Sequence, residues 1–368
     1  MKKECFVILT LLFLGFICFS FTSFKGNQKA NTDKKVFTTI LNDSVSIDMY
    51  LVYNVNSDPL KYYANVITPV CEEGLCYIIT LDIYWDLLGN FLSYEESAED
   101  PLTKFDHEQL TSSDHIKLKE ILSDKHSLLK NYNVEDLVDK TKTIASEAVL
   151  DAVASATYPP LKTAIVSGAV YSSYTLWHIV NGQVAHNIKE YTESILNDKL
   201  IKDMMRSDNF NQQFYALNKI TDDDTKFVPE IINLISNGDS YVPYFAIDKL
   251  GDSIWKIPVH QKSLIKLLSK VDFKMQNEIL NRLNTHTLYN SNQKVLISQL
   301  KILDINQQKK ALKLIDKDSI SYEILYELSK LLNTSDSTLS KSVYRILDAK
   351  GKEYKDISNK LKNYHLTN

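Results

Sequence analysis

Hydrophobic and polar positions follow two different periods along this chain of 368 residues. In the first third, "VSIDMYLVYNV" and "YYANVITPVC" are short β-rich runs, and apolar and polar residues alternate within "LCYIITLDIYWDLLGNFLSYE". A period of two places alternate side chains on one face of a strand. In the last segment, "DLLGN" separates two β-rich runs, and one face comprises Ile79, Leu81, Ile83 and Trp85. The β-rich runs predict several strands and one clear β-hairpin.

Beyond this hairpin, the apolar residues recur at the period of a helix. The segment "TSSDHIKLKEILSD" predicts a helix with Ser112 or Ser113 at its N-cap. Its apolar side would comprise Ile116, Leu118, Ile121 and Leu122. The later segment "AIVSGAVYSSYTLWHIVNG" combines small and bulky apolar residues and predicts a buried helix that connects two domains.

From about Thr192 to the end, helical segments alternate with polar joints. Each has apolar residues at positions i, i+3, i+4 and i+7, as in "EIINLIS". Pairs of these segments recur at roughly 30 residues, the size of one helical-hairpin repeat. The region resembles HEAT-like α-solenoids, in which helix pairs stack and share one elongated core. An irregular helical bundle is the alternative.

These patterns predict an α+β N-terminal domain followed by an all-α HEAT-like solenoid. The expected boundaries are a signal peptide at 1–23, a polar linker at 24–35, an α+β domain with its connecting helix at 36–182, and a helical-repeat domain at 192–368.

The first residues, "MKKECFVILTLLFLGFICFSFTS", have the order of a secretory signal: lysines, an apolar run, then small and polar residues. The apolar run is shorter than the ~20 residues that span a bilayer. We therefore expect an exported, periplasmic or extracellular protein without a membrane span in the mature chain. An uncleaved N-terminal anchor is the alternative.

Charge and motif content narrow the functional classes. The net charge of -4 gives no electrostatic reason to expect nucleic-acid binding, which requires a basic face. The sequence contains no Gly-rich phosphate loop, nucleophile elbow, His-Glu zinc helix or CxxC motif. A hydrolase has no nucleophile-base pattern to support it.

Two cysteines follow the predicted signal, Cys71 and Cys76, in "CEEGLC". An exported protein encounters an oxidising compartment, so we expect a structural disulfide across a tight hairpin. A metal site lacks nearby ligands at suitable spacing. A redox-active pair would usually have two intervening residues.

The segment "DAVASATYPPL" is similar to the motif of the covalent FMN-binding domain family: Asp, two variable residues, Ser or Thr, usually Gly, then Ala and Thr. Asp151, Ala156 and Thr157 are in register, whereas Ala154 replaces the Ser or Thr and Ser155 replaces the Gly. In this family a transferase joins the FMN phosphate to the final Thr hydroxyl. The resemblance implies that Thr157 is the acceptor of a covalent FMN.

The similarity extends over residues 70–161. The predicted hairpin corresponds to the strand pair that precedes the family's motif, and "DPLTKFDHEQL" corresponds to a loop that reaches the flavin. In that loop His107 would face the ring, where its near-neutral pKa suits proton transfer. An exposed His107 in a surface loop is the alternative. A metal site of His107 and His115 would need a third ligand that the sequence does not supply.

The leading hypothesis is an exported electron-transfer protein with FMN attached by a phosphoester to Thr157, in a site that includes Asp151, Ser155, Ala156 and His107. It would act as a flavin-dependent electron carrier or oxidoreductase component, and its helical repeats would dock a redox partner. The alternative is a non-catalytic extracytoplasmic scaffold with a degenerate FMN-binding-like domain, which Ala154 and Ser155 favour. In that case Asp151 and Ser155 are a helix end and cap.

Overall fold

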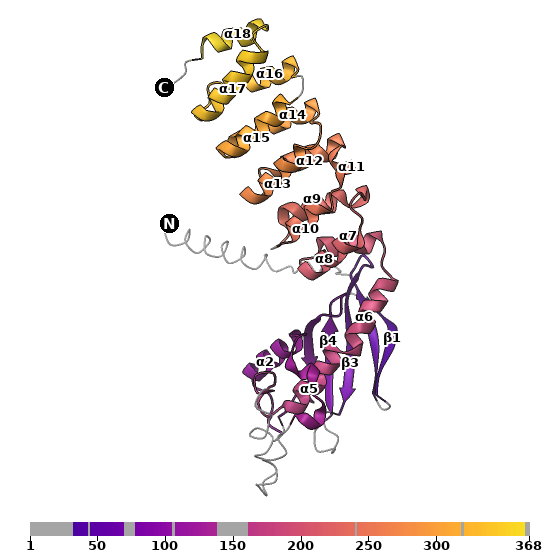
Figure 1. The fold of residues 1–368 in the computed structure, drawn as a ribbon. Helices are drawn as coiled ribbons and strands as arrows, with labels where there is room; N and C mark the ends of the chain where they lie inside the picture. Colours follow the sequence, from indigo (N-terminus) through magenta and orange to yellow (C-terminus); the bar gives the residue numbers. More distant parts are fainter. Residues whose placement is uncertain are drawn as a thin grey trace, which may run out of the picture. The chain divides into compact units, whose positions relative to one another are not determined.

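The computed structural model describes residues 32–42, 45–69, 78–104, 107–137, 161–239, 241–317 and 320–364. The chain divides into two compact units, residues 1–195 and 196–368. Figure 1 shows a sheet with helices in the first unit and helices in the second. Among the described residues the fold is therefore α+β followed by all-α.

The first unit contains a five-stranded antiparallel sheet in which each strand pairs with the next in sequence, in the order β1-β2-β3-β4-β5. The strands are β1 (Thr32–Asn42), β2 (Val45–Tyr53), β3 (Pro59–Thr68), β4 (Ile79–Trp85) and β5 (Phe91–Glu96). The alternation predicted for β4 is confirmed, because Ile79, Leu81, Ile83 and Trp85 are buried. The predicted hairpin is confirmed as β4 and β5.

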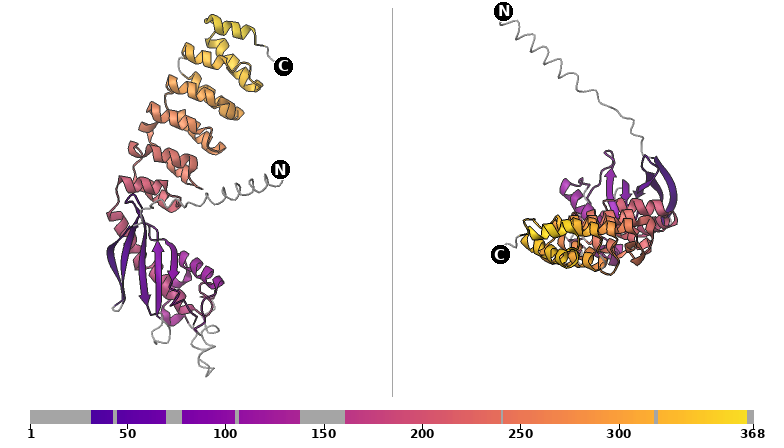
Figure 2. Two further views of the ribbon diagram at one scale, coloured as in Figure 1. Left: turned by 180° about the vertical axis from the view of Figure 1, so that it is seen from behind. Right: turned by 90° about the horizontal axis from the view of Figure 1, so that it is seen from above.

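Helices cover one face of the sheet (Figure 1), whereas the view from behind shows the opposite face of the strands (Figure 2). The helical segments are α2 (Ser112–Ser123), η1 (Leu128–Asn131), η2 (Val134–Asp136), α5 (Val170–Asn181) and α6 (Gln183–Ser194). Helix α6 contacts β1, where the Asn187 amide donates a hydrogen bond to the Thr39 hydroxyl at 3.0 Å. The hydroxyls of Tyr62 and Thr192 share a buried hydrogen bond of 2.8 Å.

The β4–β5 turn is fixed to these helices by two contacts. The indole N–H of Trp85 donates to the carbonyl of Val180 at 3.0 Å. Gly89 has a φ of +73°, and its Cα lies so close to α6 that an added Cβ would be 2.5 Å from the carbonyl oxygen of Ala185. Inside the turn, the buried Asp86 carboxylate accepts hydrogen bonds from two backbone N–H groups. The turn sequence thus fixes both the hairpin and its position against α5 and α6.

The structure corrects two details of the helix predicted at Ser112. Its N-cap is Thr111, which forms a capping box with Asp114, rather than Ser112 or Ser113. Ile116 is 63% exposed, so it does not belong to the apolar side with Leu118.

The predicted domain boundaries also change. Strand β1 begins at Thr32, so residues 32–35 belong to the sheet and not to the linker predicted at 24–35. The first unit continues through α6 to Ile195, beyond the boundary predicted at 182. Helix α5 therefore packs within the first unit and does not connect the two units.

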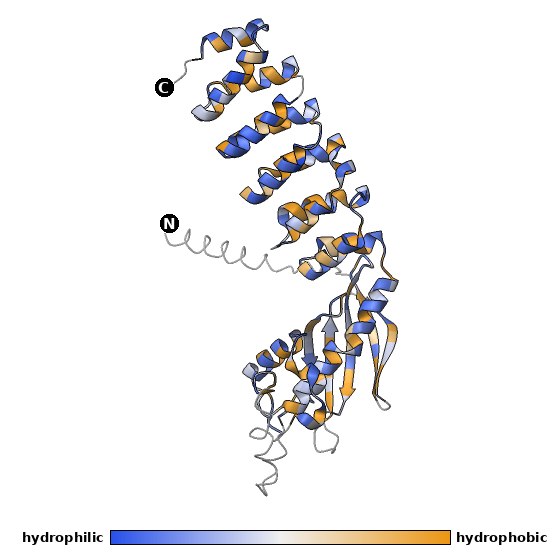
Figure 3. Ribbon diagram, in the orientation of Figure 1, coloured by the Kyte–Doolittle hydropathy of each residue, from blue (hydrophilic) through white to orange (hydrophobic). Residues whose placement is uncertain are grey.

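The second unit consists of short helices with an apolar and a polar side (Figure 3). They are α7 (Asp198–Arg206), α8 (Phe210–Lys219), η4 (Thr225–Phe227), α9 (Val228–Asn237), α10 (Val242–Asp248), α11 (Asp252–Trp255), α12 (Pro258–Leu267), α13 (Phe273–Leu283), α14 (Asn290–Gln299), η5 (Leu300–Ile302), α15 (Ile305–Asp316), α16 (Tyr322–Ser329), α17 (Ser337–Lys350) and α18 (Lys355–Lys362).

These helices form two layers. The first layer contains α7, α9, α12, α14, α16 and α18, each in contact with the next. The second layer contains α8, α10, α13, α15 and α17, and contacts join α8 to α10, α13 to α15 and α15 to α17. Between α10 and α13, the Arg282 guanidinium donates to the carbonyl of Ile247 at 3.2 Å and pairs with Asp248. Helix pairs thus succeed one another along this unit.

The second layer repeats with a period of 32 residues. The N-caps of α13, α15 and α17 are Asp272, Asp304 and Asp336, and each carboxylate accepts a backbone N–H of its helix. Four residues after each cap, a polar side chain donates to the carbonyl eight residues before it: Gln276 to Leu268, Gln308 to Leu300 and Ser340 to Leu332. The same contacts therefore join the helices of three successive pairs.

His286 is buried in the second unit, where its ring lies parallel to that of Trp255 with centroids 6.2 Å apart. Burial lowers the pKa of His286 below its ordinary value of 6.5, because the charged imidazolium is poorly solvated there. The carboxylate of Asp252 raises this pKa, and the ammonium groups of Lys256 and Lys317 lower it further.

We predict that Gly89→Ala destabilises the first unit more than Gly168→Ala does. Both glycines have a positive φ, near +73° and +77°, so each substitution should cost about 1–2 kcal/mol of unfolding free energy. Only Gly89→Ala also places a methyl group against a backbone carbonyl, which should add about 1–3 kcal/mol. At Gly168 the nearest atoms belong to the flexible side chain of Lys104. Equal losses in urea unfolding would contradict this packing of the turn.

We also predict a pH dependence from His286. Because its pKa is lower in the folded chain, the unfolding free energy is fully retained above pH 6.5 and declines as the pH falls below that value towards the folded pKa. His286→Gln, which cannot be protonated, should lose less stability between about pH 7 and pH 5. Parallel curves for the two proteins in denaturant titrations would exclude this role of His286.

Candidate functional site

The residues expected to hold a flavin lie mainly outside the described part of the chain. Asp151, Ser155, Ala156 and Thr157 belong to residues 138–160, and the two cysteines of the expected disulfide, Cys71 and Cys76, belong to residues 70–77. The structure therefore leaves the FMN attachment and the disulfide as predictions.

His107, the remaining predicted site residue, lies in the segment between β5 and α2. Its φ is +65°, and its backbone N–H donates to the carbonyl of Lys104 at 3.0 Å. Lys104 in turn forms an ion pair of 3.0 Å with Asp114 of α2. The His107 side chain is exposed, as the surface-loop alternative expects, and this does not test the proposed contact with a flavin.

His115 occupies a different environment from the one considered from the sequence. Its Nδ1 atom lies 2.7 Å from the Tyr94 hydroxyl, and its Nε2 atom lies 3.4 Å from the Glu96 carboxylate. Tyr94 is buried, and burial together with the nearby Glu96 charge raises its pKa. These contacts of His115 with Tyr94 and Glu96 orient its imidazole and join α2 to β5. Across the described residues, no group of three His, Cys, Asp or Glu side chains is arranged to hold a metal ion.

The most extensive candidate site is on the second layer of helices in the second unit. Residues at i, i+4 and i+8 lie on one face of a helix. Counted from the residue that follows each N-cap, these positions in the last three helices are Phe273, Asn277 and Asn281 in α13, Ile305, Lys309 and Lys313 in α15, and Ser337, Lys341 and Arg345 in α17. In α8 the equivalent residues are Phe210, which follows the N-cap, and Phe214; in α10 we add the N-cap itself, Tyr241, and Phe245, four residues later. We call this set the second-helix surface.

One end of the second-helix surface is aromatic. We define the aromatic end as Phe210, Phe214, Tyr241, Phe245 and Phe273. The rings of Phe214 and Phe245 are 5.4 Å apart, and Phe210 contacts Phe214 edge to face at 6.4 Å. Tyr241 is 79%, Phe273 56% and Phe210 48% exposed. Apolar residues exposed at equivalent positions of successive helices are typical of a surface that contacts a partner.

The other end of the second-helix surface is basic. We define the basic end as Lys309, Lys313, Lys341 and Arg345. Lys309 and Lys341 are 32 residues apart and hence equivalent in α15 and α17, and so are Lys313 and Arg345. Within the described residues none of the four forms an ion pair, because the nearby carboxylates pair elsewhere: Asp316 with Lys350 at 2.7 Å and Asp348 with Lys352 at 2.8 Å. The basic end therefore presents uncompensated positive charge.

Asn277 and Asn281 lie between the two ends on α13. The side-chain oxygens of both accept hydrogen bonds from the Lys310 ammonium at 3.1 Å. This contact joins α13 to α15 and keeps the middle of the surface polar.

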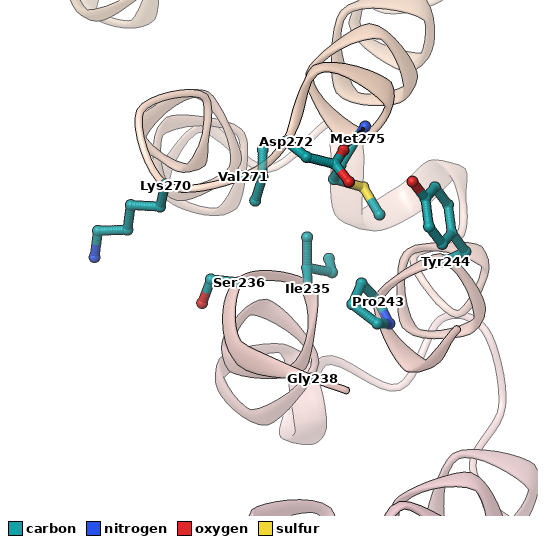
Figure 4. Close-up of a pocket in the computed structure, with 9 residues that line it drawn as sticks. All are labelled: Ile235, Ser236, Gly238, Pro243, Tyr244, Lys270, Val271, Asp272 and Met275. Carbon is teal, nitrogen blue, oxygen red and sulfur yellow. Dashed lines mark hydrogen bonds between the residues drawn. The ribbon is translucent and has the colours of Figure 1, made fainter. Parts of the chain in front are cut away.

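A pocket of about 210 Å³ opens where α10 and α13 begin. Its apolar lining comes from Ile235, Pro243, Val271 and Met275, while the Lys270 side chain points away from it (Figure 4). Drug-sized ligands occupy pockets of about 300–1,000 Å³, so this pocket has room for a side chain rather than for a cofactor such as FMN.

At the rim of this pocket, Tyr244 lies near the Asp272 carboxylate. Burial, followed by the Asp272 charge and a hydrogen bond to it, raises the pKa of Tyr244.

Comparison with known proteins finds no match: no family model, no curated protein and no solved structure is similar to this chain. Across the described residues, the helices are too short or too polar to cross a membrane.

The second-helix surface was missed in the sequence because its residues differ in type from one helix to the next. A signal was present, however. Aligning the sequence with itself at an offset of 32 residues superposes Asp272, Asp304 and Asp336, and places Phe273 on Ile305. Such a comparison would have refined the period of roughly 30 residues to 32 in this region, but it would not have shown the exposure of the residue that follows each cap.

Proposed function

We propose that this protein is an exported, non-catalytic interaction scaffold whose helical repeats dock a protein partner. The observation that carries this proposal is the repeated exposure of an apolar residue at the start of successive second-layer helices: Phe210, Tyr241, Phe273 and Ile305. A solitary exposed apolar residue is ordinary on a protein surface, whereas an aligned series is typical of a binding site.

The architecture proposed for the second unit is a HEAT-like α-solenoid. The support is the two-layer order of the helices and the 32-residue recurrence of caps and carbonyl contacts. In solenoids each repeat contacts only its neighbours, which creates an extended surface suited to long or flexible partners. Export is proposed from the order of charged, apolar and small residues at positions 1–23.

The scaffold proposal predicts a discrete partner at the second layer. A photo-crosslinking amino acid at position 273, in the full chain produced in its native cells, should give one dominant protein adduct. The matched control is position 259, because Val259 is also exposed but belongs to α12 of the first layer. The partner should then bind the purified chain, with affinity reduced by Phe273→Ser. Absence of a discrete adduct at position 273, or equal adducts at both positions, would reject the scaffold assignment.

A covalently bound FMN on Thr157 is the second candidate function. The observed β4–β5 hairpin favours it, because a strand pair around a polar turn is expected ahead of the motif in the resembling family. In this case the flavin carries the electron, the first unit supplies the tether, and the repeats dock the redox partner.

The flavin proposal predicts a change in mass. Co-expression with a flavin transferase should increase the intact mass by FMN less water, and the increase should map to the peptide that contains Thr157. Thr157→Ala should abolish it, whereas Thr163→Ala, in the described segment just beyond the motif, should not. An unmodified wild-type chain would reject the flavin and leave the scaffold proposal intact.

A further inference from the structure

We propose that the second-helix surface binds an extended acidic peptide segment that carries aromatic or aliphatic residues at one end. The inference rests on the proposed function, since it assigns the chemistry of the partner that the repeats dock. The two ends of the surface would make two kinds of contact with the peptide. The aromatic end would contact its apolar residues, and the basic end would contact its carboxylates.

Charge complementarity identifies the acidic part of the partner. The four cations of the basic end have no ion-pair partner within the described residues. An excess of positive charge is general to the second unit: residues 196–368 contain 26 Lys and Arg against 21 Asp and Glu, a net charge of +5. The whole chain, in contrast, has a net charge of -4. A peptide with several carboxylates would compensate the four cations, and such contacts increase the association rate as well as specificity.

The aromatic end identifies the apolar part of the partner. Phe210, Tyr241 and Phe273 are about half exposed or more and come from three successive second-layer helices. Exposed aromatic residues are frequent anchors of protein interfaces, because they bury much area at a small entropic cost. The neighbouring pocket lined by Val271 and Met275 is of a size to accept one apolar side chain.

The spacing of the helices favours an extended partner. Packed helices lie about 8–10 Å apart, and an extended chain rises about 3.3 Å per residue. Side chains three positions apart in an extended peptide would therefore reach successive helices of the second layer. Crossing the four intervals from α8 to α17 spans about 32–40 Å and so requires about 11–13 residues.

The test uses the full chain and a fluorescein-labelled synthetic peptide of about 15 residues, which is long enough to cover the crossing derived above. Glutamate occupies every third position of one half, Leu or Phe every third position of the other half, and Gly and Ser the remaining positions. We expect saturable binding by fluorescence anisotropy that weakens as the salt concentration rises from about 0.05 to 0.5 M, because salt screens exposed charges.

Two double variants with the same change of net charge distinguish the site. Lys309→Glu with Lys341→Glu, at the basic end, should raise the Kd about tenfold and reduce the salt dependence. Lys262→Glu with Lys266→Glu, exposed on α12 of the first layer, should change the Kd less than about twofold. Phe210→Ser with Phe273→Ser should weaken binding without altering the salt dependence, because it removes apolar contacts only. Circular dichroism checks that each variant keeps its helices.

Several outcomes would overturn the inference. These are equal effects of the two charge reversals, equally tight binding of an all-glutamate peptide, tighter binding of anionic phospholipid vesicles or of an oligonucleotide, and self-association of the chain that the basic-end variant abolishes. The crosslinking experiment separates the two levels of proposal. A discrete partner at position 273 together with no peptide binding would retain the scaffold and reject the acidic peptide.

Discussion

A pair of short helices cannot bury its apolar side unless another pair lies against it, and this constraint governs the whole second unit. Leu264 of α12 and Ile279 of α13 are fully buried, and the helices of the next pair, α14 and α15, contact these two. The same stacking can recur along the unit only if equivalent helices begin at equivalent positions. The N-caps Asp272 and Asp304 set these positions for α13 and α15. Because the helices are equally spaced where they pack in the core, their exposed side chains are equally spaced as well. The second-helix surface is therefore a consequence of burial.

The first unit meets the same constraint with a sheet. Helices α5 and α6 cover one face, and the hydrogen bond from Trp85 to Val180 fixes the hairpin beneath them. The opposite face carries a cross-strand row of Tyr50, Tyr63 and Tyr84, with ring centroids 5.1 and 5.9 Å apart. Such cross-strand aromatic pairs stabilise a sheet. The strands visible in Figure 2 therefore obtain part of their stability from their own side chains.

The sequence allowed those features to be predicted that depend on neighbouring residues. The hairpin could be predicted because alternation and a polar turn are local signals. The helices of the second unit could be predicted because the apolar residues of each helix lie within one segment of the sequence. The cap at Thr111 was missed because Ser112 and Ser113 are equally good cap residues, and the side chain of Asp114 decides among them. The aromatic and basic ends could not be predicted, since exposure of Phe273 or Lys309 depends on which helix packs beside it. Thr157 lies outside the described residues, so the flavin site remains a prediction.

The bond between Gln308 and Asp336 illustrates a wider consequence. The Gln308 amide of α15 donates at 2.9 Å to the carboxylate that also caps α17, so one side chain aligns two successive helix pairs. Such a contact ties the register of each pair to that of the one before it. Duplication of a 32-residue segment would preserve every cap and every carbonyl contact, and it would lengthen the array by one pair. The length of the second unit can therefore change during evolution by whole helix pairs, without any change in the packing of its core.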